Sequence, residues 1–295
     1  MMLTVLVGLL GAFVFGAADF LGGLGALRTS AVRVTGVAAV VGLAALLAAL
    51  PLVPSEWSSS AVLFGALSGV SGAIAISLLY ACLAIGPMSI LSPVTAVVSA
   101  VVPMSWGLLG GERLGPIGYL ALAVALVAVV LVGFTPGDAA TRPSVRGLLM
   151  AVASGAMIGV FLVLIDQTPD DSGLVPLIAN RAVNGSIMLA VLGGLALVAR
   201  RRRVIALPGA EAAHVVGRRG WLRFAVACGI VDAAANTLVL IGIRLGDLTV
   251  MSVLTAMYPA GTILLAAIVL RERIARLQVV GLVLALAAGG MLGLA

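Results

Sequence analysis

Two acidic residues lie inside long apolar runs, where an ionised carboxylate is unfavourable. Asp19 stands in the segment GAADF and Asp232 in GIVDAAANT. An ionised Asp at the centre of a membrane helix costs roughly 2.5–3.5 kcal/mol, and such residues usually face a bundle interior or a water-filled cavity. Asn236, four residues after Asp232, would share its helical face. Either carboxylate could bind a cationic or amino group or take up a proton. A structural Asp held by backbone amides or by Arg181 is the alternative.

Hydroxyl groups in neighbouring apolar runs could add neutral hydrogen bonds to such a site. Ser92 and Thr95 recur 160 residues later as Ser252 and Thr255, and the members of each pair share a helical face because they are three residues apart. Hydroxyl side chains in such helices more often pack against a neighbouring helix than bind a ligand. The full set of predicted binding residues is Asp19, Asp232, Asn236, Tyr80, Ser92, Thr95, Thr255 and Tyr258.

The residues needed for a metal, a cofactor or catalysis are not combined in a known pattern. Cys82 and Cys228 lie in apolar runs without CxxC spacing, so we expect neither a disulfide nor a metal site. The lone His214 lies in the polar segment 200–220 and the chain has no Lys, so an activated serine and an HExxH zinc site are missing. GIVDA is not the glycine–aspartate signature of an aspartyl protease. An intramembrane enzyme is therefore a remote alternative.

The composition shows which elements must position these residues. The chain is 62% hydrophobic and 9% charged, whereas soluble domains carry roughly 25% charged residues. A run of about 20 apolar residues spans the ~30 Å hydrocarbon core, and only helices or closed barrels satisfy the backbone there. The runs lack period-two alternation, which favours helices. The net charge of +6 comes from arginines in the links between runs, so we expect lipids rather than nucleic acid as partners.

Charged residues, prolines and glycines divide the chain into ten apolar runs, which predicts an all-α integral membrane protein with ten transmembrane helices. The runs are roughly 3–27, 31–53, 61–84, 89–110, 115–134, 146–165, 174–199, 221–243, 248–270 and 277–294. The segment 200–220 is the one link that is long and polar enough to lie in water.

The second half of the chain repeats the first. Residues 86–134 align without a gap on 246–294, and the pair Glu112–Arg113 falls on Glu272–Arg273. The chain has only four Glu, so this coincidence carries more weight than matches among Ala, Leu and Gly. We therefore predict two five-helix repeats, 1–135 and 142–295. Because five is odd, the second enters the membrane from the opposite side, and inverted repeats of this kind place a substrate site near the midplane.

A second set of residues is predicted to be gating or structural. A Glu at the start of a helix interacts favourably with the helix dipole, by ~0.3–1 kcal/mol, and prolines permit a helix to bend. Arg33 and Arg181 each open a helix. The set comprises Pro93, Pro103, Pro259, Glu112, Glu272, Arg33 and Arg181.

The arginines are distributed unevenly between the two sides of the predicted bundle. Fourteen of the 17 lie in the links on one side and three on the other. The arginine-rich side is expected in the cytoplasm. This prediction places the 200–220 loop in the cytoplasm and both termini outside, in a multi-pass protein of the inner membrane.

These motifs resemble ten-helix bacterial transporters of the EamA type, in the drug/metabolite transporter superfamily. The resemblance rests on the glycine in FGAADF, the arginines that open helices 2 and 7, the turn LAIGPMS (83–89) and the two Glu-Arg pairs. The family tends to have a proline some 13 residues before each Glu. Pro259 matches, whereas Ser99 takes that place in the first half. Family members are commonly drawn with cytoplasmic termini, against the arginine count here.

The resemblance implies a secondary transporter with helices 1, 3, 4, 6, 8 and 9 around a central cavity and helices 5 and 10 outside. Its expected function is export of small metabolites, amino acids or drugs by alternating access, with protons as the candidate coupling ion. A lipid-carrier flippase or a facilitative importer of the same fold stays open, as does the choice between monomer and homodimer. A channel is disfavoured because neither a carbonyl filter nor an acidic vestibule is evident.

Overall fold

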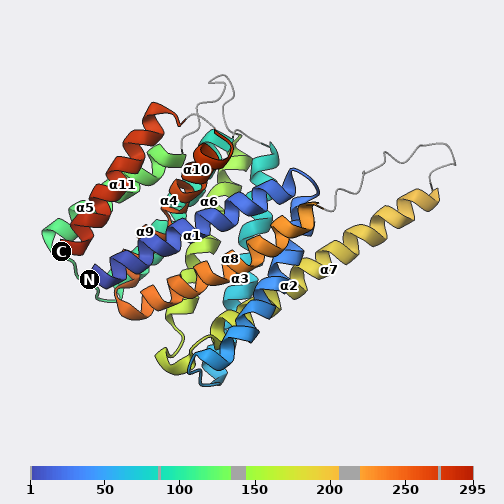
Figure 1. Ribbon diagram of the computed structural model, residues 1–295, viewed down its shortest axis with the longest axis horizontal. Coiled ribbons are helices and arrows are strands. Elements are labelled where there is room, and N and C mark those ends of the chain that lie inside the picture. The colour runs from blue at the N-terminus through green and yellow to red at the C-terminus, as the bar shows by residue number, and fades with distance from the viewer. Residues whose placement is uncertain (1, 86–87, 134–143, 206–219, 272–273, 295) are drawn as a thin grey trace.

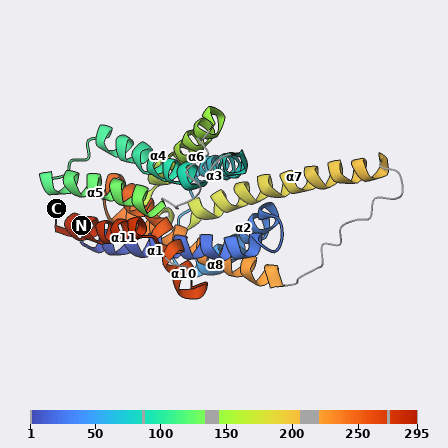
Figure 2. The same cartoon turned by 90° about the horizontal axis from the view of Figure 1, so that it is seen from above.

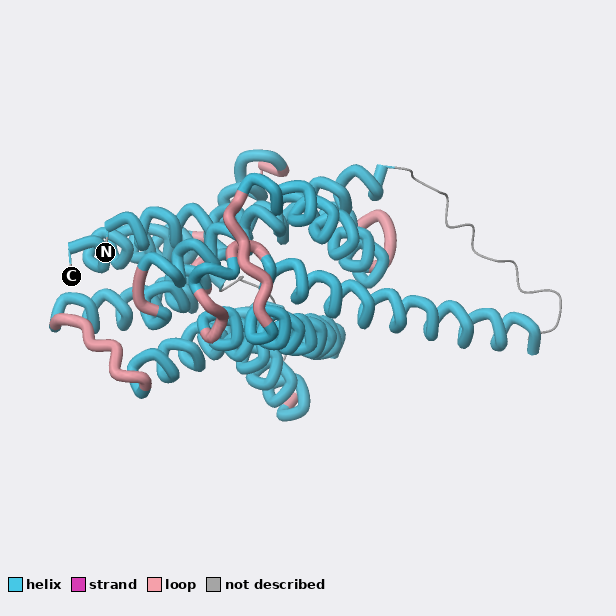
Figure 3. Tube along the Cα trace, turned by 90° about the horizontal axis from the view of Figure 1, so that it is seen from below, coloured by secondary structure: helices cyan, strands magenta, loops and turns pink. Residues whose placement is uncertain are grey.

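The computed structural model describes residues 2–85, 88–133, 144–205, 220–271 and 274–294. All the regular elements in these ranges are helices. The ten predicted spans are all present as helical segments long and apolar enough to cross a membrane, which confirms the predicted fold class. Figure 3 shows helices joined by short loops, with the start of the first helix and the end of the last at the same end of the molecule.

The helices of the first half are α1 (Met2–Ala26), α2 (Ala31–Ala49), α3 (Ser59–Ile85), α4 (Met88–Leu109) and α5 (Pro116–Gly133), with a short 3-10 helix, η1, at Leu50–Leu52. Those of the second half are α6 (Val145–Asp166), η2 (Asp170–Ser172), α7 (Val175–Ile205), α8 (Gly220–Leu245), α9 (Leu248–Thr255), α10 (Tyr258–Val269) and α11 (Arg276–Leu294).

Two spans differ from the sequence-based boundaries. The seventh does not end at residue 199, because α7 continues through the four arginines to Ile205 and projects beyond the bundle (Figure 1). The ninth span is two helices, α9 and α10, separated by a turn at Ala256 and Met257. The first half differs here, since α4 is continuous although it contains Pro93 and Pro103.

The helices form two groups, each with members from both halves of the chain. In one group α3 and α4 pack against α6, and α3 also packs against α7; in the other α1 packs against α8 and α10, and α2 against α8. Figure 2 shows α3, α4 and α6 above α1, α2 and α8. Helix α9 lies between the groups, in contact with α4 and α1. Helices α5 and α11 pack against each other at one edge (Figure 1).

Candidate functional site

A cavity of about 220 Å³ lies between the two groups of helices. Its walls come from α1, α3, α4, α6, α7, α8 and α9, together with the first residue of α10. Both mid-span acids, Asp19 and Asp232, line it, as does Asn236. The helices that the family resemblance placed around a cavity therefore do surround one, and α7 joins them. No described residue of α5 or α11 is among the lining residues.

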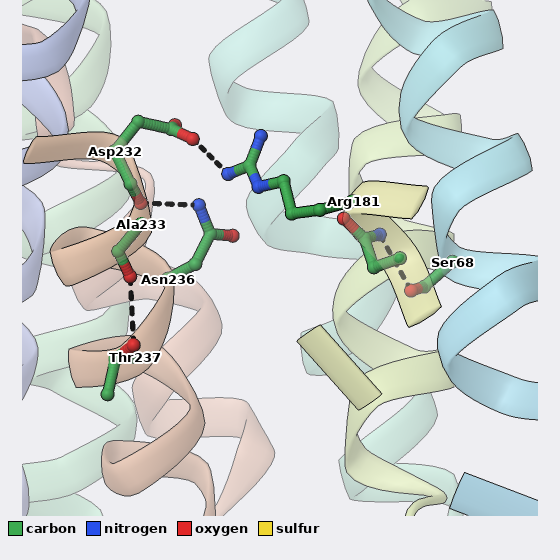
Figure 4. A network of polar contacts seen from close by, with 7 residues as sticks. Ser68, Arg181, Asp232, Ala233, Asn236 and Thr237 are labelled. Atoms are coloured by element: carbon green, nitrogen blue, oxygen red, sulfur yellow. Dashed lines mark hydrogen bonds and ion pairs between the residues drawn. The ribbon is translucent and has the colours of Figure 1, made fainter. Parts of the chain in front are cut away.

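Asp232 forms an ion pair with Arg181 across the cavity. The guanidinium Nη2 of Arg181, on α7, donates to Oδ2 of Asp232, on α8 (Figure 4). The side chains are 14% and 23% exposed respectively. One turn along α8, Asn236 is 5% exposed and its Nδ2 donates to the backbone carbonyl of Asp232 at 2.8 Å. Arg181, predicted as a gating residue that opens a helix, is thus part of the cavity wall.

Asp19 has no comparable partner. Its side chain is exposed at the cavity, and it forms no hydrogen bond or ion pair with any residue in the described ranges. Asp19, Asp232 and Arg181 are the carboxylates and the guanidinium among the lining residues; the phenol of Tyr258 also lines the cavity. Since the arginine is paired with Asp232, the cavity carries one spare carboxylate when all three groups are ionised.

Helix α7 supplies two amides that sequence reasoning missed. Asn180 and Asn184 line the cavity and flank Arg181 on the same helical face. The Nδ2 of Asn180 donates to Oγ of Ser68 on α3 at 2.8 Å (Figure 4), and Ser68 donates in turn to the carbonyl of Gly65 at 2.7 Å. The available signal in the sequence was that Asn180, Arg181 and Asn184 are three polar residues within five positions of an apolar run. The first-half counterpart of α7 lacks them, so the repeat did not point to them.

The turn between α9 and α10 borders the cavity, with Thr255, Ala256 and Tyr258 among the lining residues. Pro259, the second residue of α10, has no N–H to continue the helix. The amide of Met257 donates to Leu254, three residues back, at 3.1 Å. The predicted bend at Pro259 is therefore a break. Oγ1 of Thr255 is buried and has no hydrogen-bond partner among the described residues.

Two other predicted binding residues, Thr95 and Ser92, are not among the residues that line the cavity. Thr95 is fully buried, and its Oγ1 donates to the carbonyls of Leu91 at 3.0 Å and Ala151 at 3.2 Å, so it joins α4 to α6. Ser92 is partly buried and is not among the lining residues. The side chain of Tyr80 lies outside the described part of the structure. Ser99, one turn after Thr95, does line the cavity.

Glu112 connects the two halves of the chain. We expected it to interact with the start of its own following helix. Instead, its two carboxylate oxygens accept hydrogen bonds from the backbone amides of Leu248 and Thr249, each at 2.9 Å. These amides belong to the first turn of α9, whose unpaired N–H groups carry partial positive charge. The repeat-related Glu272 lies outside the described residues. Arg33, near the start of α2, is exposed.

The end of the bundle near Glu112 is closed. Residues 248–254 of α9 are all buried, and so is the start of α7, from Leu174 to Ile178. Arg244, at the end of α8, donates from Nη2 to Oγ of Ser172 at 2.8 Å and to the carbonyl of Pro169 at 3.3 Å. These contacts tie the link between α6 and α7 to α8. Access to the cavity from this end requires that they separate.

Comparisons with known proteins agree with this architecture. The sequence profile of the EamA-like transporter family matches residues 145–293. A protein of known crystal structure shares the fold with a TM-score of 0.69 over 99% of this chain and 98% of that chain, at 18% sequence identity. No curated protein sequence matches the chain. The family match spans half of the chain, and it agrees with the ten spans and the central cavity. The chain therefore belongs to the EamA-like transporter family, within the drug/metabolite transporter superfamily, and is a membrane transporter.

Proposed function

We propose that the protein is a secondary-active carrier that exports a small molecule by alternating access, with protons as the coupling ion. The observation that carries this proposal is the central cavity that holds the Arg181–Asp232 pair and the spare carboxylate of Asp19. Ionisable groups inside a membrane bundle are costly and mark substrate and proton pathways. A carboxylate without a fixed partner can bind a proton and a substrate in turn.

The two halves, 1–135 and 142–295, are proposed to be inverted repeats that move against each other. The packing supports this, because the most extensive helix contacts have counterparts five spans away. Helix α1 packs on α8 as α6 packs on α3, and α2 packs on α8 as α7 packs on α3. In the contacts α2–α7, α4–α9 and α5–α11, a helix of the first half packs against its own counterpart in the second half. A pair of related halves around a midplane site is the usual plan of alternating access.

The closed end is proposed to face outward. The arginine distribution supports this orientation, with the termini and the Glu112 end proposed to lie outside the inner membrane and the 200–220 segment in the cytoplasm. In this orientation the structure represents a state that is shut toward the outside. Release of α9 from Glu112, with bending at the turn of Ala256 and Met257, would open the outer end.

Transport by the purified protein in liposomes tests the function. We expect saturable uptake of at least one amino acid or cationic drug that rises with an imposed pH gradient. Asp19→Asn should abolish the dependence on the gradient, and Asp232→Asn should reduce uptake because it leaves Arg181 unpaired. Glu56→Gln is the matched control, since Glu56 is an exposed acid in a link. Retention of saturable, gradient-dependent uptake by both cavity variants would contradict the site.

A further inference from the structure

The charges of the cavity select the charge of the ligand. Arg181 and Asp232 neutralise each other, and Asp19 leaves a formal charge of −1. An unpaired charge inside a membrane bundle is unfavourable. A monocation removes that charge, whereas a zwitterion leaves it unchanged and an anion doubles it. Protonation of Asp19 also removes the charge of −1. A proton and a cation can therefore bind to the cavity in turn, as the proposed carrier requires.

The break in the ninth span adds hydrogen-bond acceptors at the cavity wall. Pro259 cannot donate to the carbonyl of Thr255, and the amide of Ala260 donates to Met257 at 2.9 Å rather than to Ala256. The carbonyls of Thr255 and Ala256 thus lose their usual partners four residues on. They lie at the C-terminal end of α9, where the helix dipole is negative. The buried, unpartnered hydroxyl of Thr255 lies beside them.

The crossing of α1 and α10 places the start of α10, directly after this break, against Gly16 of α1, and Asp19 lines the same cavity as Thr255 and Ala256. A Cβ at Gly16 would lie 2.5 Å from the carbonyl oxygen of Tyr258, and Oγ1 of Thr262 donates to the carbonyl of Gly16 at 3.1 Å. Asp19 follows Gly16 by three residues. Because helical side chains tilt toward the N-terminus, its carboxylate leans back toward the level of the break.

The opposite walls of the cavity are apolar, and its volume is small. Ile76 and Leu79 of α3 and Ile158 and Phe161 of α6 line it. Sites for drug-sized ligands have volumes of about 300–1,000 Å³, and this cavity has about 220 Å³. The apolar walls suit an organic body better than a hydrated metal ion. The volume suits a metabolite-sized molecule better than a drug.

Resting on the proposed carrier function, we propose that the substrate is a small monoamine whose ammonium group binds between the Asp19 carboxylate and the C-terminal end of α9. An ammonium has three donors and no acceptor, which matches a site made of a carboxylate, a hydroxyl and main-chain carbonyls. Its apolar body lies against α3 and α6. Asp232, already paired with Arg181, positions α8 and does not contact the ammonium.

Calorimetric titration of the purified full-length protein with matched probes tests this inference. The probes are 2-phenylethylamine, its neutral analogue 2-phenylethanol, the zwitterion phenylalanine, the anion 3-phenylpropanoate, and sodium chloride. We expect 2-phenylethylamine to bind with an affinity about 10- to 100-fold higher than that of 2-phenylethanol, as expected for loss of a charged hydrogen bond. Asp19→Asn should abolish this preference and Asp19→Glu should keep much of it. Thr255→Val should weaken amine binding by about 2- to 10-fold.

Several results would overturn the inference. These are absence of saturable amine binding up to millimolar concentration, an unchanged amine preference in Asp19→Asn, equal or tighter binding of the zwitterion or the anion, and displacement of the amine by sodium at similar concentration. Saturable transport of phenylalanine that depends on Asp19, without transport of amines, would refute the amine class and leave the carrier function standing. Loss of Asp19 and Asp232 without any effect on transport would refute both.

Discussion

The hydrogen bonds between Glu112 and α9 are predicted to hold the closed end of the bundle together. The carboxylate accepts from the amides of Leu248 and Thr249, each at 2.9 Å. Oγ1 of Thr249 also donates to the carbonyl of Met104 at 3.3 Å. Glu112→Ala removes both charged bonds and leaves two amides of the first turn of α9 without acceptors. The end of α4 and the start of α9 then lose their strongest polar contact.

The expected energy follows from the number and the burial of these bonds. A hydrogen bond to a charged group contributes about 1.5–3 kcal/mol. Glu112 is only partly buried, so water replaces some of what is lost, and we expect about 2–3 kcal/mol for the two bonds together. At 1.4 kcal/mol for each factor of ten, opening of this end should become about 30- to 150-fold more frequent.

Hydrogen exchange of the protein in nanodiscs measures this opening directly. Peptides that cover residues 248–255 should exchange about 30- to 150-fold faster in Glu112→Ala than in the wild type. Peptides from α5 (Pro116–Gly133), which does not line the cavity, should be unchanged. Glu112→Gln should show an intermediate effect, because a neutral amide still accepts one hydrogen bond.

Arg113→Gln is the matched control, since Arg113 is adjacent in sequence and exposed. It should leave the exchange of residues 248–255 as in the wild type. Equal exchange in Glu112→Ala and wild type would refute the reasoning. That result would mean that the apolar packing of α9, buried from Leu248 to Leu254, closes this end without the carboxylate.

Three further perturbations test other parts of the structure. Arg181→Gln should destabilise the protein by about 3 kcal/mol, because it leaves the charge of Asp232 unpaired; thermal unfolding should show partial recovery in the double variant with Asp232→Asn, and an additive loss would contradict the pairing. Gly16→Ala should lower the melting temperature and the transport rate, since its Cβ would approach the carbonyl of Tyr258 to 2.5 Å; wild-type behaviour would show that α1 and α10 can separate freely. Burial raises the pKa of Asp247, in the link between α8 and α9, above its ordinary value. The ionised form is therefore penalised in the folded state, so Asp247→Asn should raise the melting temperature at pH 7. The difference should vanish below about pH 4, where the unfolded chain also binds the proton; a gain that is independent of pH would exclude this cause.

The apolar character of the chain made several features predictable. Ten spans follow from runs of sufficient length, because the membrane imposes one length and one type of hydrogen bonding on each crossing. Asp19 and Asp232 were expected at a cavity, since lipid excludes charge, and both line one. The bend at Pro259 was predicted from its missing N–H. Its form, a two-residue turn at Ala256 and Met257 that separates α9 from α10, was not.

Partners that lie far apart in the chain could not be predicted in the same way. Arg181 was one of several possible partners for an aspartate, and only the packing of α7 near α8 selects Asp232. Asn180 and Asn184 were not singled out, because an amide in an apolar run can equally well face a neighbouring helix. Glu112 was assigned to the helix next in sequence, and it caps one 136 residues away.

The sequence by itself determined that the chain forms ten helices in a membrane and that two acids must be sheltered from lipid, and it predicted that the second half repeats the first. Hydropathy and charge decide these features locally, residue by residue. Only the tertiary structure decided which acid is paired with an arginine and which has no such partner among the described residues. That choice depends on which helices pack together and on how far along the bundle their residues meet. The hydropathy of the sequence is the same for every arrangement of ten apolar helices, so it cannot distinguish between them.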